Sequence, residues 1–453
     1  MQPSDWNSFD AAAARVRVLS WPMYWKEAKI YEFDSNVLES LACAATGRTS
    51  SLLPRLQQLT WDTSRHDYPY LSLFLTPTLT NLTVCISTGP GNIESDRMRC
   101  SVLGSLVSQC PSVRSVELWA RWSSLEFSAR SWIDLFSEQP SSASTLFSVW
   151  TALDSLCFRG MDLSTLTDVI AQLPVLTKLE LHGCRVTITL LSTSVTGFPT
   201  LRHLSMHGCS VDSCLHVLKR MSCSPLSSLH LCAVDPHRSN EYRWTDLFSH
   251  LQKSISRDSL AVTSFSINRH GIIPPRLQSI LPLLGFRNPP IILSFQSLSP
   301  LLHFRNISEF DYGGRSNIDL DDDNVMRIVK AWPHLKSFAI RPWHPAKPRL
   351  TLHALTALAM HCPELEVLVI SIDATTVIHY KDLGKDWFES NLRNLDVYRS
   401  PIDDPGLVAA FITVIFPNVT EISVAPPANT QNWKDWKEVE RMLRSSQLAG
   451  GRK

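Results

Sequence analysis

The chain has 453 residues and an almost even balance of charge, with 43 Lys and Arg against 42 Asp and Glu. Charged residues make up 19% of it and hydrophobic residues 44%, so it can bury a large core and wholesale disorder is excluded. This balance gives no electrostatic case for nucleic acid or an anionic membrane surface as a partner. Leucine is unusually common at 60 residues, which average composition does not predict.

The chain carries no sign of secretion or membrane insertion. Its first residues contain no basic segment followed by an apolar one, and the longest apolar run near the C-terminus, 407–416, is too short to span a bilayer. The 11 cysteines are odd in number and form no C-x-x-C pair. We therefore expect reduced thiols and a cytoplasmic or nuclear location, or both.

One pattern recurs along the whole chain: a short turn, often with proline, followed by apolar-x-x-apolar-x-apolar. This spacing places alternate apolar side chains on one face of a short strand. The copies begin 23 to 45 residues apart. Leucine-rich repeats have a period of about 20–29 residues, so the longer intervals require insertions. We predict strands within 16–21, 56–61, 79–84, 113–118, 153–158, 176–181, 201–206, 226–231, 262–267, 307–312, 335–340, 365–370, 392–397 and 419–424.

Between the strands, apolar residues recur at helical spacing. In chain order we predict helices at 163–173, 215–221, 325–332 and 433–443. One strand with its return helix cannot bury its own apolar face, so neighbouring repeats must stack. The predicted fold is an α/β leucine-rich-repeat solenoid, a curved parallel sheet lined by helices, with about 13–14 irregular repeats. A further degenerate repeat could lie around 291–295.

Two copies read L-x-L-H-G-C (179–184) and L-x-M-H-G-C (204–209), and cysteine precedes proline at positions 110 and 362. These motifs resemble the cysteine-containing leucine-rich repeats of F-box proteins. Longer stretches are similar to the F-box/leucine-rich-repeat proteins abundant in mushroom-forming fungi. These stretches are 14–19, 52–61, 71–82, 319–335, 361–368, 405–417 and 436–443.

The resemblance implies a scaffold that binds a protein substrate as the substrate receptor of a cullin-type ubiquitin ligase. In that family a helical F-box before the repeats docks the Skp adaptor. Residues 1–45 contain no recognisable F-box, because its leucine-proline start and cysteine-x-x-tryptophan end are absent. We therefore expect Skp adaptor and cullin as partners only if an F-box lies upstream. A stand-alone repeat module without ligase attachment is the alternative.

We expect three parts: a leading segment at 1–45 with a possible first repeat, the repeat array at 46–428, and a helix with a frayed tail at 429–453. The last part carries an apolar stripe at helical spacing. Membrane association and a partner helix are alternatives, but a cap is favoured because solenoid ends must be covered. The stripe consists of Trp433, Trp436, Val439, Met442 and Leu443.

The sequence contains no phosphate loop, H-E-x-x-H, G-x-S-x-G or G-x-G-x-x-G motif, so we expect no enzyme and no cofactor. The acid run 319–324 begins like a calcium loop but lacks its glycine and final glutamate, which favours a helix N-terminal charge cluster. The His/Cys-rich window 203–232 could suggest zinc. However, Cys184 and Cys209 share a repeat position where cysteine serves as a small buried hydrophobe, so we expect no metal.

The residues that flank the middle and last apolar positions of each copy point away from the core, to the concave side of the sheet. A strand spacing of about 4.8 Å should set His182 next to His207. The pattern fits a solvated polar face or a binding patch for a protein partner, since solenoids recognise partners on this side. The candidate binding residues are Arg159, Lys178, Glu180, His182, His203, His207, His230, Asn268, Arg341 and Tyr398.

Overall fold

The structure is a computed structural model that divides into two compact units. The first unit is Met1–Cys209 with Arg220–Ser224, and the second is Ser210–Lys219 with Pro225–Lys453. The residues that the structure describes are 3–20, 35–46, 51–62, 68–88, 109–122, 149–164, 166–186, 197–221, 224–234, 241–268, 291–314, 316–341, 348–376, 390–424 and 430–450.

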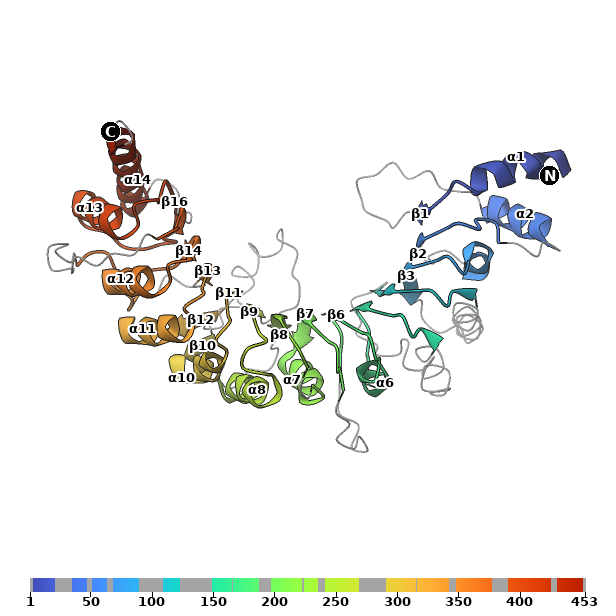
Figure 1. Ribbon diagram of the computed structural model, residues 1–453, viewed down its shortest axis with the longest axis horizontal. Helices are drawn as coiled ribbons and strands as arrows, with labels where there is room; N and C mark the ends of the chain where they lie inside the picture. Colours follow the sequence, from blue (N-terminus) through green and yellow to red (C-terminus); the bar gives the residue numbers. More distant parts are fainter. Residues whose placement is uncertain are drawn as a thin grey trace, which may run out of the picture. The chain divides into compact units, whose positions relative to one another are not determined.

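The first unit is built on parallel strands that pair with one another in chain order (Figure 1). The strands are β1 (Val18–Ser20), β2 (Gln58–Asp62), β3 (Asn81–Thr88), β4 (Ser115–Trp122), β5 (Ser155–Arg159), β6 (Lys178–His182) and β7 (His203–Ser210). Its described helices are α1 (Pro3–Ala13), α2 (Ser35–Ala45), the 3-10 helix η1 (Tyr68–Phe74) and α6 (Thr167–Ala171).

The second unit repeats the same construction with more regular helices, which lie along one side of its strands (Figure 1). Its main strands are β8 (Ser228–Val234), β9 (Val262–Asn268), β11 (Glu309–Gly314), β13 (Ser337–Ile340), β14 (Val367–Val369), β15 (Asn394–Asp396) and β16 (Glu421–Ser423). Its described helices are α7 (Val211–Lys219), α8 (Glu241–Ser254), α10 (Phe295–Leu298), the 3-10 helix η2 (Ser299–His303), α11 (Asp322–Ala331), α12 (Leu352–His361), α13 (Pro405–Ile415) and α14 (Gln431–Gly450).

Every strand predicted from the repeat is present, so the predicted α/β leucine-rich-repeat solenoid is confirmed. With one exception, each strand begins two residues after the first apolar position of its copy. In these copies that first residue lies in the preceding turn and, apart from the half-buried Val16, is buried there; Leu176 and Leu201, for example, are both 0% exposed. The exception is β9, which is present at the predicted place although the predicted start of its apolar pattern, residue 262, was wrong by two residues. Its buried positions are Leu260, Thr263 and Phe265, and the polar Thr263 obscured the copy.

The stretch 291–295 does not add a strand to the main sheet. It forms β10 (Ile291–Ser294), which pairs in parallel with β12 (Ser316–Asp319) in a separate two-stranded sheet. The acid run that follows opens α11, as predicted. The Asp321 carboxylate accepts the Asn324 amide at 2.9 Å, and the Asn324 side chain reaches back to the Asp321 amide in a capping box. Such a box satisfies amides that a helix start leaves unpaired.

The starts of β2 to β7 and of β9, β11, β13 and β14 are each fixed by one carbonyl that accepts two backbone amides of the following repeat. The Asp154 carbonyl accepts the amides of Thr177 and Lys178 at 2.8 and 3.0 Å, and the Thr177 carbonyl then accepts those of Arg202 and His203 at 2.8 and 2.9 Å. This contact sets the register between repeats. The same double contact is made by the carbonyls of Arg17, Gln57, Thr80 and Arg114 in the first unit and of Ser227, Ala261, Ser308 and Lys336 in the second.

The cysteines at the shared repeat position are buried, as the sequence predicts. The Cys184 thiol donates to the Phe158 carbonyl at 3.3 Å, and the Cys209 thiol to the Leu181 carbonyl at 3.5 Å. Burial is the main reason why the pKa of Cys184 is raised to about 12. The Cys184 thiol therefore stays protonated, and both thiols link one repeat to the preceding one by a hydrogen bond.

The predicted C-terminal helix is present as α14, which contacts α13 and β16. Trp436 is fully buried, and its indole Nε1 donates to the Ser400 carbonyl at 2.9 Å. Val439 and Leu443, on the same stripe, are also buried. The second unit itself thus covers these three residues of the apolar stripe, while Trp433 and Met442 are half-buried. Of the described residues, none belongs to a helix long and apolar enough to cross a membrane.

The shared leucine core predicts a large cost for removing one strand leucine. Leu204 is 0% exposed, so Leu204→Ala should lower the free energy of unfolding by about 2–5 kcal/mol through lost apolar burial and a cavity. Urea denaturation followed by circular dichroism measures this. Val175→Ala is the matched control, because Val175 is 39% exposed in the adjacent turn and should change little. Equal losses for the two variants would contradict the assigned core.

Candidate functional site

Strands β4 to β7 of the first unit present a continuous set of side chains on the side opposite the buried leucines, which we call the open face. In β6, Leu179 and Leu181 are buried while the residues between and beside them are partly exposed. The strand register aligns these open-face residues in three rows. The first row is Ser115, Ser155, Lys178 and His203; the middle row is Glu117, Cys157, Glu180 and Ser205; the last row is Trp119, Arg159, His182 and His207.

Arg159 is held between a carboxylate and an aromatic ring from β4. Its Nε donates to Glu117 Oε1 at 2.8 Å, and its guanidinium carbon lies 4.6 Å from the centre of the Trp119 ring. Both contacts favour the cation and limit the conformations of a long side chain. The Arg159 side chain remains 36% exposed, so it is held in place and still open to a partner.

Glu180 lies at the centre of the open face and contacts both its neighbours along β6. Its Oε1 pairs with the Lys178 ammonium at 2.7 Å, and its Oε2 lies 3.6 Å from His182 Nε2, longer than a hydrogen bond. Burial alone would raise the pKa of the Glu180 carboxyl, but Lys178 and then His182 bring it below its ordinary value. Glu180 is therefore ionised at neutral pH.

His182 and His207 stack across β6 and β7, where the strand spacing predicts neighbouring rings. Their ring centres are 5.0 Å apart and their planes differ by 15°. His207 Nε2 shares a hydrogen bond of 2.8 Å with the Ser205 hydroxyl. Burial, followed by the charges of Arg159 and His207, lowers the pKa of His182, with Glu180 opposing the shift. His182 is accordingly neutral at physiological pH.

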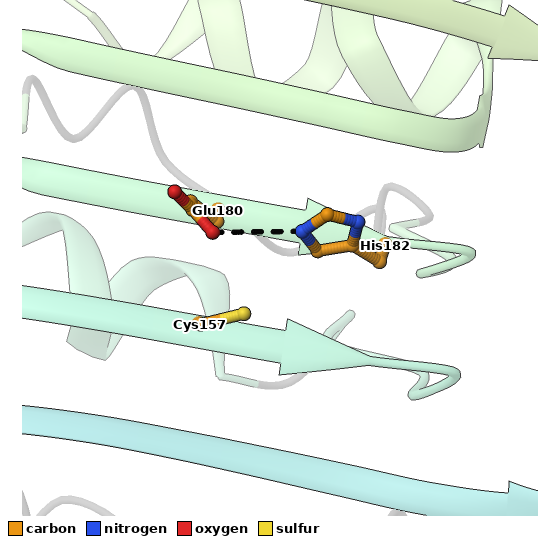
Figure 2. A group of neighbouring side chains, drawn as sticks. All are labelled: Cys157, Glu180 and His182. Carbon is orange, nitrogen blue, oxygen red and sulfur yellow. Dashed lines mark ion pairs between the residues drawn. The ribbon is translucent and has the colours of Figure 1, made fainter. Parts of the chain in front are cut away.

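Three donor groups converge on this face from two strands (Figure 2). Cys157 on β5 and Glu180 and His182 on β6 each place one metal-binding atom within 4.8 Å of the other two. Within the portion of the chain described here, this is the single group of three His, Cys, Asp or Glu donors so close together. The described donors of the window 203–232 form no such group, and Cys223 lies outside the described residues.

Six of the predicted binding residues come together on the open face: Arg159, Lys178, Glu180, His182, His203 and His207. Of these, His203 lies beside Lys178 in the first row and is exposed. The rows also contain residues that the prediction did not include as binding residues, above all Glu117 and Cys157. Glu117 and Cys157 lie between the middle and last apolar positions of their copies, as Glu180 does. The repeat pattern could therefore have identified them as residues of the open face.

The remaining predicted residues belong to the second unit. His230 Nε2 shares a hydrogen bond of 3.0 Å with the Ser228 hydroxyl. Arg341 follows β13 and forms an ion pair with Asp311. Asn268 ends β9, and its side chain lies outside the described residues. Tyr398 was expected at a strand position but lies in the turn after β15, with a left-handed φ of 53°.

The chain matches no family model and no curated protein. Similar solved structures include a chain from the yeast Rad7 and Elc1 complex, 14% identical, with 87% of this chain and 85% of that one covered and a TM-score of 0.35. Another is a leucine-rich-repeat protein of Leptospira interrogans, 12% identical, with coverages of 92% and 98% and a TM-score of 0.30. Neither likeness assigns a partner or an activity to this chain.

The Glu117–Arg159 contact predicts a measurable coupling between β4 and β5. In a double-mutant cycle of Glu117→Gln and Arg159→Gln, we expect a coupling free energy of about 0.2–1 kcal/mol, because the pair is partly exposed. Urea denaturation of the four proteins gives this value. The cycle of Glu117→Gln with His203→Asn is the control, since those residues do not touch, and its coupling should be near zero. Indistinguishable couplings in the two cycles would contradict the assigned pair.

Proposed function

We propose that the chain is a non-enzymatic scaffold that recognises a protein partner through the open face of its first unit. The observation that carries the proposal is the set of ordered, partly exposed side chains in register across β4 to β7. Contacts within the face hold these side chains before any partner arrives. A binding surface of this kind loses less conformational entropy on association than one with mobile side chains.

The residue types on the face suit protein recognition. Arginine and tryptophan are enriched among residues that dominate binding energy, and Arg159 stacks on Trp119 here. Each cation is matched by a carboxylate, Arg159 by Glu117 and Lys178 by Glu180. A face with both signs of charge favours a protein partner over the uniformly charged backbone of a nucleic acid.

We further propose that the partner is a substrate for ubiquitination, with the chain as receptor of a cullin-type ligase in the cytoplasm or nucleus. This finer role rests on the resemblance of the repeats to those of F-box proteins, and it requires an F-box to recruit the Skp adaptor. The second candidate is a stand-alone interaction module. It rests on the repeats alone and needs no F-box.

The proposed face predicts which variants lose the partner. The triple variant Arg159→Ala, Lys178→Ala, His203→Ala should capture its protein partner at least about tenfold less than the wild type, because it removes three exposed contact residues. Quantitative mass spectrometry of affinity-purified, tagged full-length chain measures this. Arg55→Ala is the matched control, an exposed basic residue in the turn before β2. Equal capture by the triple variant and the wild type would contradict the proposal.

The same purification separates the two finer roles. Skp adaptor and cullin recovered together with the face-dependent partner would support the ligase receptor. Recovery of the face-dependent partner without them would support the stand-alone module.

A further inference from the structure

The side chains of Cys157, Glu180 and His182 form a cluster of three metal donors: a soft thiol sulfur, a hard carboxylate oxygen and a borderline imidazole nitrogen. Cys157 and Glu180 are register partners on β5 and β6, and His182 lies two residues beyond Glu180 on the same side of its strand. Figure 2 shows the three side chains on one face of the two strands. Cys157 and Glu180 are 23 residues apart in the sequence and become neighbours because β5 and β6 pair in this register. The cluster therefore depends on the pairing of consecutive repeats.

Two of the donor atoms, Glu180 Oε2 and His182 Nε2, remain able to bind an ion. Glu180 uses Oε1 for Lys178 and turns Oε2 towards His182. The Nε2 atom of His182 is buried and makes no hydrogen bond. A buried polar nitrogen without a hydrogen bond is costly, and a bound cation would offset that cost.

The distances fit a tetrahedral ion. Zinc bonds of about 2.0–2.3 Å at tetrahedral angles place two ligand atoms about 3.3–3.8 Å apart. His182 Nε2 and Glu180 Oε2 are 3.6 Å apart, within that range. Cys157 Sγ lies within 4.8 Å of a donor atom of each of the other two residues. It now lies 3.6 Å from Glu117 Oε1, so a rotation of its short side chain away from Glu117 would complete the set.

We propose that Cys157, Glu180 and His182 bind a divalent cation of the zinc class through thiolate sulfur, carboxylate oxygen and imidazole nitrogen, with the fourth position open to water. A mixed sulfur, nitrogen and oxygen set favours zinc, whereas magnesium and calcium take oxygen ligands. The proposal does not depend on the proposed recognition of a protein.

Binding exchanges the Cys157 thiol proton for the ion, and the proton is released to solvent. Burial, and next the negative charge of Glu117, raises the pKa of Cys157, so the thiol is protonated without metal. The two carboxylates of the site, Glu117 and Glu180, are balanced in charge by their ion-pair partners Arg159 and Lys178. Loss of the proton leaves one net negative charge, which attracts a cation.

His207 acts as a positioning residue for the proposed ligand His182. Its ring stacks on that of His182 at 5.0 Å, and Ser205 holds it in turn. Fixing the ring plane of a ligand lowers the cost of ordering it when the ion binds.

The test uses full-length protein stripped of metal with a chelator and titrated with zinc alone by calorimetry. The wild type should bind one zinc ion in this cluster, and Cys157→Ser, Glu180→Gln and His182→Asn should each bind at least about tenfold more weakly. Cys232→Ser and His230→Asn, on β8, are the matched controls and should bind like the wild type. Magnesium or calcium should not compete.

A second measurement needs no variant. Cobalt added to the stripped wild type should give a thiolate-to-cobalt charge-transfer band. The proposal is overturned if the wild type binds no stoichiometric zinc, if Cys157→Ser binds like the wild type, or if cobalt gives no thiolate charge-transfer band.

Discussion

The structure depends on one kind of contact, in which a single carbonyl accepts two backbone amides of the next repeat at the start of β2 to β7, β9, β11, β13 and β14. A parallel strand cannot satisfy its backbone groups within its own repeat, so each repeat is completed by its neighbours. The double contact at Asp154 and again at Thr177 fixes where the following strand begins. Once the start is fixed, the leucines that alternate along the strand enter the shared core together.

The same register that buries the leucines aligns the remaining side chains. Side chains on alternate residues share a face, so one fixed start per strand produces rows across four strands of the first unit. Contacts along and between these rows, such as Glu117 with Arg159, hold polar groups that would otherwise move freely in solvent. Both the proposed protein-binding face and the proposed cation site are consequences of this alignment.

The repeat pattern predicted the strands because three apolar positions per strand are a strong signal, and it predicted that His182 and His207 would be neighbours. At β9 it predicted the strand but misplaced the apolar positions by two residues, because a buried threonine replaces the middle apolar residue. The template sets Cys157 beside Glu180, but it could not predict how closely their donor atoms approach each other and His182, because that depends on side-chain conformation. The density of histidine and cysteine in the sequence is highest at 203–232, whereas the described donor cluster combines residues of β5 and β6.

Native-state hydrogen exchange of the backbone amides in β4 to β7 tests the central claim most directly. If the inter-repeat ladder holds the open face, the strand amides of Leu179, Leu181 and Leu204 should exchange slowly and as one cooperative group, far more slowly than exposed amides in the turns. If the β6 amides exchange as fast as those of the turns, the backbone hydrogen bonds between repeats do not hold the open face in place. That result would contradict the account.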